Sequence, residues 1–273
     1  MSGFFIFDDI IAIEEGIMEY NSWNAYKYIT AITTKRNGGF SKGPFAKANF
    51  AFHVGDSQND VTANRQALLR DLGLHEKQLI TTYQSHSDII KKVAHADGGA
   101  GAFSFESGIP ADALYTYDKH LALAIFHADC VPVFLFDKVK KWVAIIHAGM
   151  AGSLKAITEK AINHLVKHEG SRPQDIFAYC GPSLTFAYNP IDETTKTAIL
   201  SLNPDFHYAI KKSDGIFYLD VPLLNYGQLR KAGIPSSNIT MSGIDTFSHP
   251  DEYFSATREK QTGRHLSIIM RNR

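Results

Sequence analysis

Cysteine is nearly absent from the chain, with only Cys130 and Cys180 among 273 residues. Two cysteines cannot build the disulfide framework of a small secreted domain, so reduced thiols are expected. The opening segment, MSGFFIFDDIIAIEEG, also lacks the basic region and the small-residue cleavage site of a signal peptide. These features predict a cytoplasmic protein. Cys180 is expected to be a packed structural thiol, because no histidine or acidic residue adjoins it in the sequence.

An excess of charge is missing too, because 28 Lys and Arg balance 28 Asp and Glu. No general attraction to nucleic acid or to anionic membranes is therefore expected. The longest apolar stretch, 121–136, is interrupted by His127, Asp129 and Pro132 and is shorter than the ~20 residues of a membrane-spanning helix. The expected partners are small molecules, and the chain is expected to act as a monomer or a homodimer.

Repeats, low-complexity segments and long linkers are missing as well, which predicts one domain over residues 1–273. The apolar stretch predicts a buried strand that is broken near Asp129 and Cys130. Further strands are predicted at 141–149, 176–180, 238–241 and 265–270, and helices at 61–73 (with Asp60 as N-cap), 152–170 and 220–233. This mixture indicates an α/β or α+β fold with central sheets and outer helices.

His86, Cys130 and His147 each stand where a predicted strand gives way to a turn. Such positions combine a rigid scaffold with an open side chain. One thiolate and two imidazoles suit zinc, and three protein ligands leave the fourth position of a catalytic zinc free. No CxxC or HExxH pair is present, so on spacing alone a buried thiol and two ordinary histidines are the simpler interpretation.

Two neighbours of Cys130 leave alternatives open. A thiolate activated by an imidazole also fits nucleophilic catalysis. Asp129 is a candidate to orient an imidazole, relay a proton or cap a turn. His127 alternates with Asp129 along the predicted strand, so both are expected on one face. There, His127 either binds substrate or is a hydrogen-bonded core residue.

Three arginines lie in glycine-containing or polar segments. Arg36 belongs to TTKRNGGFSKGPF, and Arg258 and Arg264 belong to FSATREKQTGRH. Such segments can hold phosphate or carboxylate through backbone N–H groups and guanidinium forks. For Arg36 the simpler interpretation is a solvated cation in a glycine turn, and the other two either bind an anion or lie on the surface. A further glycine cluster, in DGGAGAFSFESG, predicts a surface loop.

The ordered motifs of the chain resemble those of the YfiH family of laccase-domain proteins over about residues 33–270. They are TTKRNGGFSKGPFAKANFAFHVGD, NRQALL, QSHS, ADALYTYDKHLALAIFHADCVPVFLFD, VAIIHAGMAG, CGPSL, FYLDVPLLNYGQLRKAGI and YFSATREKQTGRHLSIIM. The resemblance implies a single-domain layered α/β sandwich related to the cytotoxic necrotizing factor catalytic domain. It also implies that His86, Cys130 and His147 bind zinc.

The activity that the resemblance implies is zinc-dependent purine nucleoside chemistry. It comprises phosphorolysis of adenosine, inosine, guanosine or methylthioadenosine, and deamination of adenosine. The expected catalytic residues are the three zinc ligands and Asp129, a candidate proton shuttle. The expected substrate-binding residues are Arg36, Arg258, Arg264 and His127, with phosphate at the first two.

Three other functions remain open. The first is an amide hydrolase that edits a peptidoglycan precursor, with Cys130 or a zinc-activated water as the attacking group. The second is a metal-binding relative that has lost catalysis. Copper polyphenol oxidation is the least favoured, because multicopper oxidation uses paired arrays of histidines that this sequence lacks.

The chain departs from the family pattern near the expected substrate wall. Ser87 replaces the usual glycine after the first histidine, and Met150 and Ala151 replace Trp-Arg after the second. The segment FAYNPID lacks the family's cysteines, and Ala256-Thr257 replaces Tyr-Arg. The departures imply an altered substrate wall beside an intact metal trio.

Overall fold

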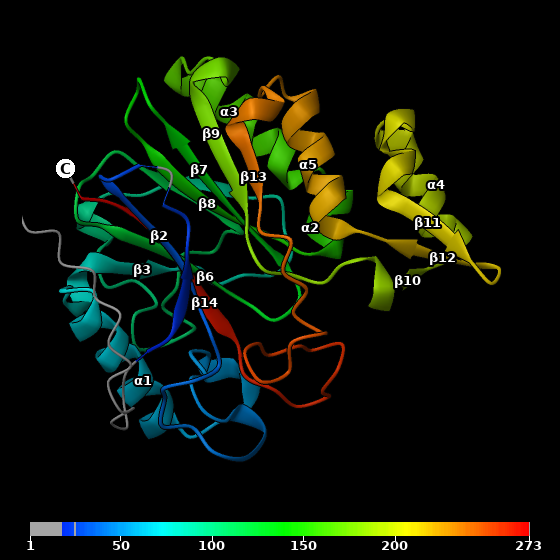
Figure 1. Ribbon diagram of the computed structural model, residues 1–273. Helices are drawn as coiled ribbons and strands as arrows, with labels where there is room; N and C mark the ends of the chain where they lie inside the picture. The colour runs from blue at the N-terminus through cyan, green and yellow to red at the C-terminus, as the bar shows by residue number, and fades with distance from the viewer. Residues whose placement is uncertain (1–17, 25, 273) are drawn as a thin grey trace, which may run out of the picture.

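The computed structural model describes residues 18–24 and 26–272. Two mixed β-sheets lie face to face at its centre (Figure 1). The five-stranded sheet has the order β1 (Tyr20–Ser22), β2 (Ile29–Thr34), β14 (His265–Arg271), β6 (Ala122–His127), β3 (Leu79–Thr81). The six-stranded sheet has the order β13 (Ile239–Met241), β9 (Ile176–Cys180), β7 (Val131–Asp137), β8 (Val143–Ala148), β5 (Ala113–Thr116), β4 (Ile90–Lys92). The expected layered sandwich is confirmed.

The break in the long apolar stretch is the point where the chain passes from one sheet to the other. Leu123 of β6 and Phe134 of β7 belong to the same buried cluster between the sheets. Every residue of both strands is buried, which explains the nearly continuous apolar sequence, since alternation is lost where both faces of a strand are covered. The segment between the strands, 128–130, therefore lies at one end of the sandwich.

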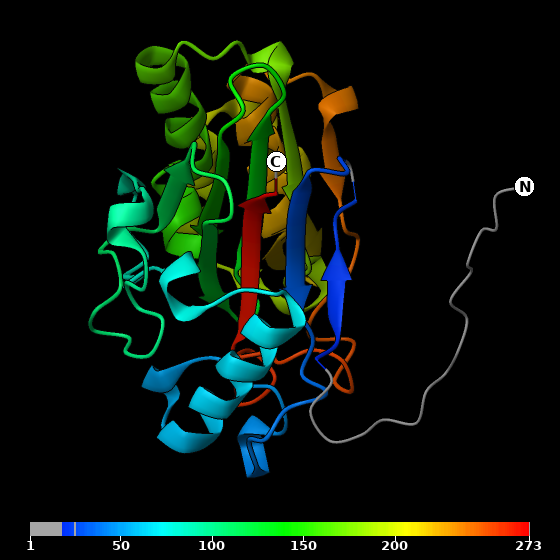
Figure 2. The ribbon, with the colours of Figure 1, turned by 90° about the vertical axis from the view of Figure 1, so that its left-hand side faces the viewer.

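Helices cover the outer faces of the two sheets. α1 (Gln58–Asp71) packs on the five-stranded sheet, in which β14 (red) lies beside β2 (blue) (Figure 2). α2 (Met150–Leu154), α3 (Ile157–Glu169) and α5 (Val221–Lys231) pack on the six-stranded sheet. The expected helix at 152–170 is divided into α2 and α3 because Ala156 adopts a left-handed conformation, with φ of 57°.

The N-cap expected for α1 was wrong by one turn. Ser57 is the N-cap, and its hydroxyl accepts a hydrogen bond from the Asp60 N–H at 3.3 Å. Asp60 occupies the third helical position instead, where its charge still favours the N-terminal end of the helix. The C-terminal end of α3 follows expectation, because Gly170 adopts the left-handed conformation (φ of 65°).

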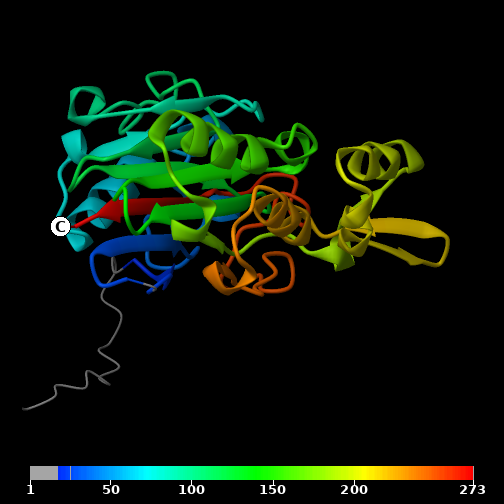
Figure 3. The same ribbon diagram turned by 90° about the horizontal axis from the view of Figure 1, so that it is seen from above.

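A smaller lobe extends from one side of the sandwich (Figure 3). It contains α4 (Glu193–Leu202) and a third sheet with the order β10 (Pro190–Ile191), β12 (Ile216–Leu219), β11 (Ile210–Ser213). Within 18–24 and 26–272, no helix has the length and apolar character that a bilayer crossing requires.

Candidate metal centre

The structure brings His86, Cys130 and His147 together at the end of the sandwich where β6 passes into β7. The three ligand atoms all lie within 4.8 Å of one another, and Cys130 Sγ is 3.9 Å from His86 Nε2. His86 comes from the loop after β3 and is exposed, whereas His147 belongs to β8 and is only 2% exposed. The cluster is thus closed on the His147 side and open on the His86 side.

Asp112, a residue that the sequence analysis missed, holds two of the three ligands. The Nδ1–H of His147 donates to Asp112 Oδ1 at 2.8 Å, so Nε2 is the ring nitrogen left to face Cys130. The same carboxylate accepts the backbone N–H groups of Ser85, His86 and Ser87 at 2.7–3.2 Å. A carboxylate that orients a ligating imidazole is the usual outer partner of a metal site.

The Asp112 carboxylate is fully buried, and its charge is stabilised locally. Burial by itself raises the pKa of this carboxyl, but hydrogen bonds from His147 and Ser87 outweigh burial and bring the pKa to about 2. Ser87, which departs from the family's glycine, contributes its hydroxyl to this arrangement at 2.6 Å. The departure at Ser87 therefore stabilises the His86 loop. Asp112 directly precedes β5, whose residues are all buried. An acidic residue at such a position is a sequence signal for a structural or site role, because a buried carboxylate needs hydrogen-bond partners.

Cys130 and His147 form a charge-coupled pair. Burial raises the pKa of the Cys130 thiol, but the charge of His147 and hydrogen bonds from both imidazoles lower it to about 6. Burial lowers the pKa of His147, but the charge of Cys130 and the hydrogen bond to Asp112 raise it to about 9. At neutral pH the sulfur is therefore a thiolate, which is the form that binds a metal or attacks a carbonyl.

Gly149, the first residue after β8, leaves room for the cluster. A Cβ atom at this position would lie 2.7 Å from Cys130 Sγ and 2.9 Å from His86 Cδ2. Any side chain here would displace two of the three candidate ligands. The glycine of the IIHAG segment is thus required by close approach, since its own φ of −74° is ordinary.

The residues next to Cys130 occupy less open positions than expected. Asp129 lies beyond β6 with φ of 90°, so it does not share a strand face with His127, and that expectation was wrong. Its carboxylate accepts the Thr246 hydroxyl and the Thr257 N–H, each at 2.7 Å. Asp129 thus connects the loop 246–257 to the segment 128–130 that carries Cys130. Its role in proton transfer stays a prediction.

His127 is inside the sandwich and is only 2% exposed. Its Nε2 lies 2.8 Å from the Ser267 hydroxyl, and its Nδ1 has no hydrogen-bond partner in the part of the chain that the structure describes. Burial lowers its pKa well below the ordinary range, so the ring is neutral. This geometry favours the core alternative over a substrate contact.

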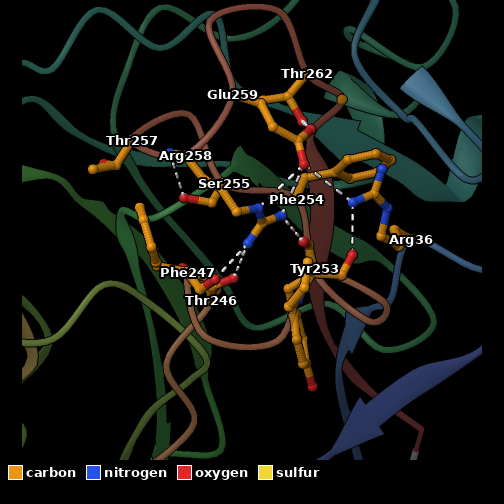
Figure 4. Close-up of polar contacts among 12 residues, drawn as sticks. Arg36, Thr246, Phe247, Tyr253, Phe254, Ser255, Thr257, Arg258, Glu259 and Thr262 are labelled. Atoms are coloured by element: carbon orange, nitrogen blue, oxygen red, sulfur yellow. Dashed lines mark hydrogen bonds and ion pairs between the residues drawn. The ribbon is translucent and has the colours of Figure 1, made fainter. Parts of the chain in front are cut away.

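Arg258 donates through all three of its side-chain nitrogens to groups of the protein, and Arg36 does so through Nε and Nη1 (Figure 4). Arg258 pairs with Glu259, and its remaining donors point at the carbonyls of Thr246, Phe247 and Tyr253 at 2.7–2.8 Å. Arg36 lies 4.7 Å from the centroid of the Phe254 ring and donates to Ala46 and Pro250 carbonyls and to Glu259. Both side chains connect loops, and phosphate binding by them stays a prediction.

Arg264 keeps more of its donors available than Arg36 or Arg258, and it lies near the strand end that leads to Cys130. Its Nη1 donates to the carbonyls of Thr262 and Gly263, while Nε and Nη2 have no partner among residues 18–24 and 26–272. Because His265 pairs with His127, Arg264 lies opposite Ala128, two residues from Cys130. Burial lowers the pKa of Arg264, and the charges of Cys130 and Asp129 oppose that shift.

Comparison with known proteins gives consistent matches over nearly the whole chain. A family model described as multi-copper polyphenol oxidoreductase laccase matches residues 30–272. The purine nucleoside phosphorylase YlmD of Bacillus subtilis (strain 168) is 34% identical over 249 residues, covering 90% of this chain and 89% of that protein. A purine nucleoside phosphorylase of Bacteroides thetaiotaomicron is 30% identical and covers 95% of this chain and 98% of its own length.

Two solved structures share the fold closely. The Bacillus licheniformis hypothetical protein YfiH superposes with a TM-score of 0.89 at 32% identity, covering 92% of this chain and 96% of that one. YlmD from Geobacillus stearothermophilus also gives a TM-score of 0.89, at 30% identity, with 95% and 99% coverage.

Proposed function

The chain belongs to the multi-copper polyphenol oxidoreductase laccase family, and from that premise we propose that it is a zinc-dependent purine nucleoside phosphorylase. The observation that carries the proposal is the cluster of His86, Cys130 and His147, with its open side at His86. One thiolate and two imidazoles are zinc ligands, and an open side is what separates a catalytic zinc from a structural one.

A single zinc fits the described residues better than an array of coppers. The trio is the one group of three or more His, Cys, Asp or Glu residues in 18–24 and 26–272 that could hold a metal ion. Multicopper oxidation needs several histidine-rich sites, whereas phosphorolysis needs one electrophilic centre. Copper is therefore the less favoured metal.

Phosphorolysis replaces one bond to the sugar C1′ with another. The bond from C1′ to the purine N9 breaks with its electron pair going to the purine, a phosphate oxygen bonds to C1′, and the proton that the phosphate gives up passes to the purine. A bound zinc would supply Lewis acidity on the open side of the trio. Arg264 supplies guanidinium donors for the phosphate, and Asp112 keeps His147 in the tautomer that ligates through Nε2.

Adenosine deamination at C6 belongs to the same proposal as a second reaction of the site. It replaces an amino group by an oxygen from water and needs no phosphate. Dependence on phosphate therefore separates the two reactions in one assay.

A second function is favoured by one specific observation. Cys130, His147 and Asp112 stand in the order of a Cys–His–Asp triad, with the His147 Nδ1–H bonded to the carboxylate. This arrangement suits acyl transfer without a metal, as in amide hydrolysis of a peptidoglycan precursor. It predicts activity that survives chelation and is lost on alkylation of Cys130.

The proposal is tested with untagged protein and two matched cysteine variants. Wild type and Cys180→Ala should each hold about one zinc per chain and release purine from inosine, guanosine, adenosine or methylthioadenosine only with phosphate present. Cys130→Ser should lose both metal and turnover. Turnover that persists in Cys130→Ser would refute the zinc phosphorylase, and cleavage of a muramyl-peptide amide by metal-free protein would establish the acyl-transfer function.

A further inference from the structure

Three aromatic rings from separate segments contact one another at the surface, and we call His53, Tyr83 and Phe105 the aromatic shelf. The ring centroids of His53 and Phe105 are 4.0 Å apart, and those of Tyr83 and Phe105 are 4.7 Å apart. Tyr83 is 43% exposed and His53 is exposed as well, whereas Phe105 is partly buried and packs on the apolar cluster of the five-stranded sheet. Exposed rings in mutual contact offer apolar faces on which a planar ligand can stack.

Sheet topology places the aromatic shelf at the same end of the sandwich as the metal trio. β3 and β6 run parallel, so Tyr83, which follows β3, and Cys130, which follows β6, lie at the same end of the sheet. The Gln84 side chain joins these strand ends, because it accepts the Phe126 N–H and donates to the Phe126 carbonyl, both at 2.7 Å. Two residues after Gln84 the chain reaches His86.

Arg264 connects the segment that leads to His53 with the strand end that leads to Cys130. Its backbone N–H donates to the Asn49 side chain at 2.9 Å, and its carbonyl accepts the Phe50 N–H at 3.1 Å, three residues before His53. Its strand register places it opposite Ala128 on the other side. The face of the His53 ring that lies against Phe105 is desolvated, which lowers the pKa of His53 to about 4, and the charge of Arg264 adds to this, so the ring is neutral at pH 7.

The glycine-containing loop that carries Phe105 is fixed against the end of β3. The Tyr83 N–H donates to the Ile109 carbonyl at 2.7 Å, and the Thr81 N–H donates to the Ala100 carbonyl at 2.9 Å. A Cβ at Gly108 would lie 2.7 Å from the Tyr83 nitrogen, so the loop approaches this closely only with glycine there. Phe105 is therefore held over Tyr83 by backbone contacts.

Met150 does not supply a stacking plane at the position where the family resemblance implies tryptophan. Its side chain is only partly exposed and packs against the apolar cluster beneath the helices of the six-stranded sheet. An aromatic surface for a base would come from another element, and the aromatic shelf is such a surface at the same end of the sandwich as the metal trio.

We propose that the aromatic shelf binds the purine base of the nucleoside by stacking, with the phosphate at Arg264 and the bond to be cleaved between them. This inference rests on the proposed phosphorylase function and names its base-recognition surface. Stacking of a base on an aromatic side chain is sequence-tolerant but favours the larger purine ring over a pyrimidine. Inosine should therefore bind more tightly than uridine.

The test measures binding of inosine and, separately, of inorganic phosphate to zinc-loaded protein by calorimetry, without the second reactant. Tyr83→Ala should raise the Kd of inosine about 5-fold or more, as loss of one stacking partner implies. Tyr83→Phe, which keeps the aromatic ring, should bind inosine with the wild-type Kd. Phe105→Ala should behave like Tyr83→Ala. Tyr208→Ala is the matched control, because Tyr208 is 41% exposed and lies in the separate lobe next to β11. The Kd of phosphate should stay unchanged in all variants.

The outcomes separate this inference from the function on which it rests. Wild-type protein that binds no nucleoside overturns the phosphorylase and the aromatic shelf together. Wild-type binding with an inosine Kd in Tyr83→Ala and Phe105→Ala within 2-fold of wild type overturns the aromatic shelf alone. A parallel loss of phosphate binding in both variants also overturns it, since that result assigns the rings to packing of the site.

Discussion

At the scale of single residues, Asp112 links two of the three candidate metal ligands through one buried carboxylate. It orients the His147 ring through Nδ1 and shapes the His86 loop through three backbone N–H groups. Losing such an outer partner typically weakens metal binding about 10- to 100-fold. The contribution of Asp112 is therefore measurable while all three ligands are present.

We expect Asp112→Asn to lower the zinc affinity about 10- to 100-fold in a chelator competition assay. Asp175→Asn is the control, because Asp175 is also buried but pairs with Arg172 and Lys138 near β9. Equal zinc affinities in wild type and Asp112→Asn would show that the carboxylate has no part in holding the metal.

The Cys130–His147 pair predicts how zinc binding depends on pH. Cys130, with its pKa of about 6, is already a thiolate above that pH, whereas His147, with its pKa of about 9, is still protonated. Zinc must displace the His147 proton, so affinity should rise about tenfold per pH unit between pH 6 and 9 and more steeply below pH 6. Calorimetry in buffers of different ionisation enthalpy should find about one proton released per zinc at pH 7.5, and an affinity that is flat from pH 7 to 9 would contradict the coupling.

At the scale of elements, the turn from β8 into α2 sets the space available to the ligands. Gly149→Ala should abolish stoichiometric zinc binding, because the added methyl meets Cys130 Sγ and His86. Gly152→Ala, three residues further on α2, has its nearest contact at 3.4 Å and should keep the metal. Elemental analysis of both variants, with melting temperatures to confirm folding, checks the prediction; zinc retained by Gly149→Ala would show that the ligands can move apart without loss.

How far the elements follow from sequence depends on how they are buried. β6 and β7 are buried on both faces, so their apolar runs predict them. β4 has three residues with no buried side chain, and α4 buries only Ile199, so neither shows an apolar stripe. β2 carries buried threonines among its apolar residues. The hydroxyl of one of them, Thr33, is hydrogen-bonded to the Ser267 hydroxyl of the neighbouring strand β14.

Some residues of the candidate site were also predictable from the sequence, and others were not. The clustering of His86, Cys130 and His147 was predictable because their motifs resemble those of a known family. Asp112 was not, because its function depends on contacts with residues 85–87 and 147 that are distant in sequence. The free donors of Arg264 and the occupied donors of Arg258 depend on where loop carbonyls point, which no sequence pattern in the chain encodes.

At the scale of the whole molecule, we expect the fold to form without a bound metal. Apolar clusters lie between the sheets and beneath the helices on both outer faces, and the trio stands at one end of the sandwich. A chain of this length buries roughly three quarters of its unfolded surface without a structural ion.

Metal-free protein should therefore keep its far-UV circular dichroism spectrum and unfold cooperatively. Added zinc should raise the melting temperature through preferential binding to the folded state. Cys130→Ser should show the metal-free melting temperature with or without zinc. A metal-free protein that is unfolded at 25 °C would mean that zinc is part of the core.

One metal ion at His86, Cys130 and His147 is proposed to support phosphorolysis. The most direct measurement is a zinc titration of metal-free protein, in which the initial rate of phosphate-dependent hypoxanthine release from inosine is followed against added zinc. We expect a rate near zero without metal that rises linearly and saturates at one zinc per chain. A rate that does not respond to zinc, or that saturates only with several equivalents of copper, would contradict it.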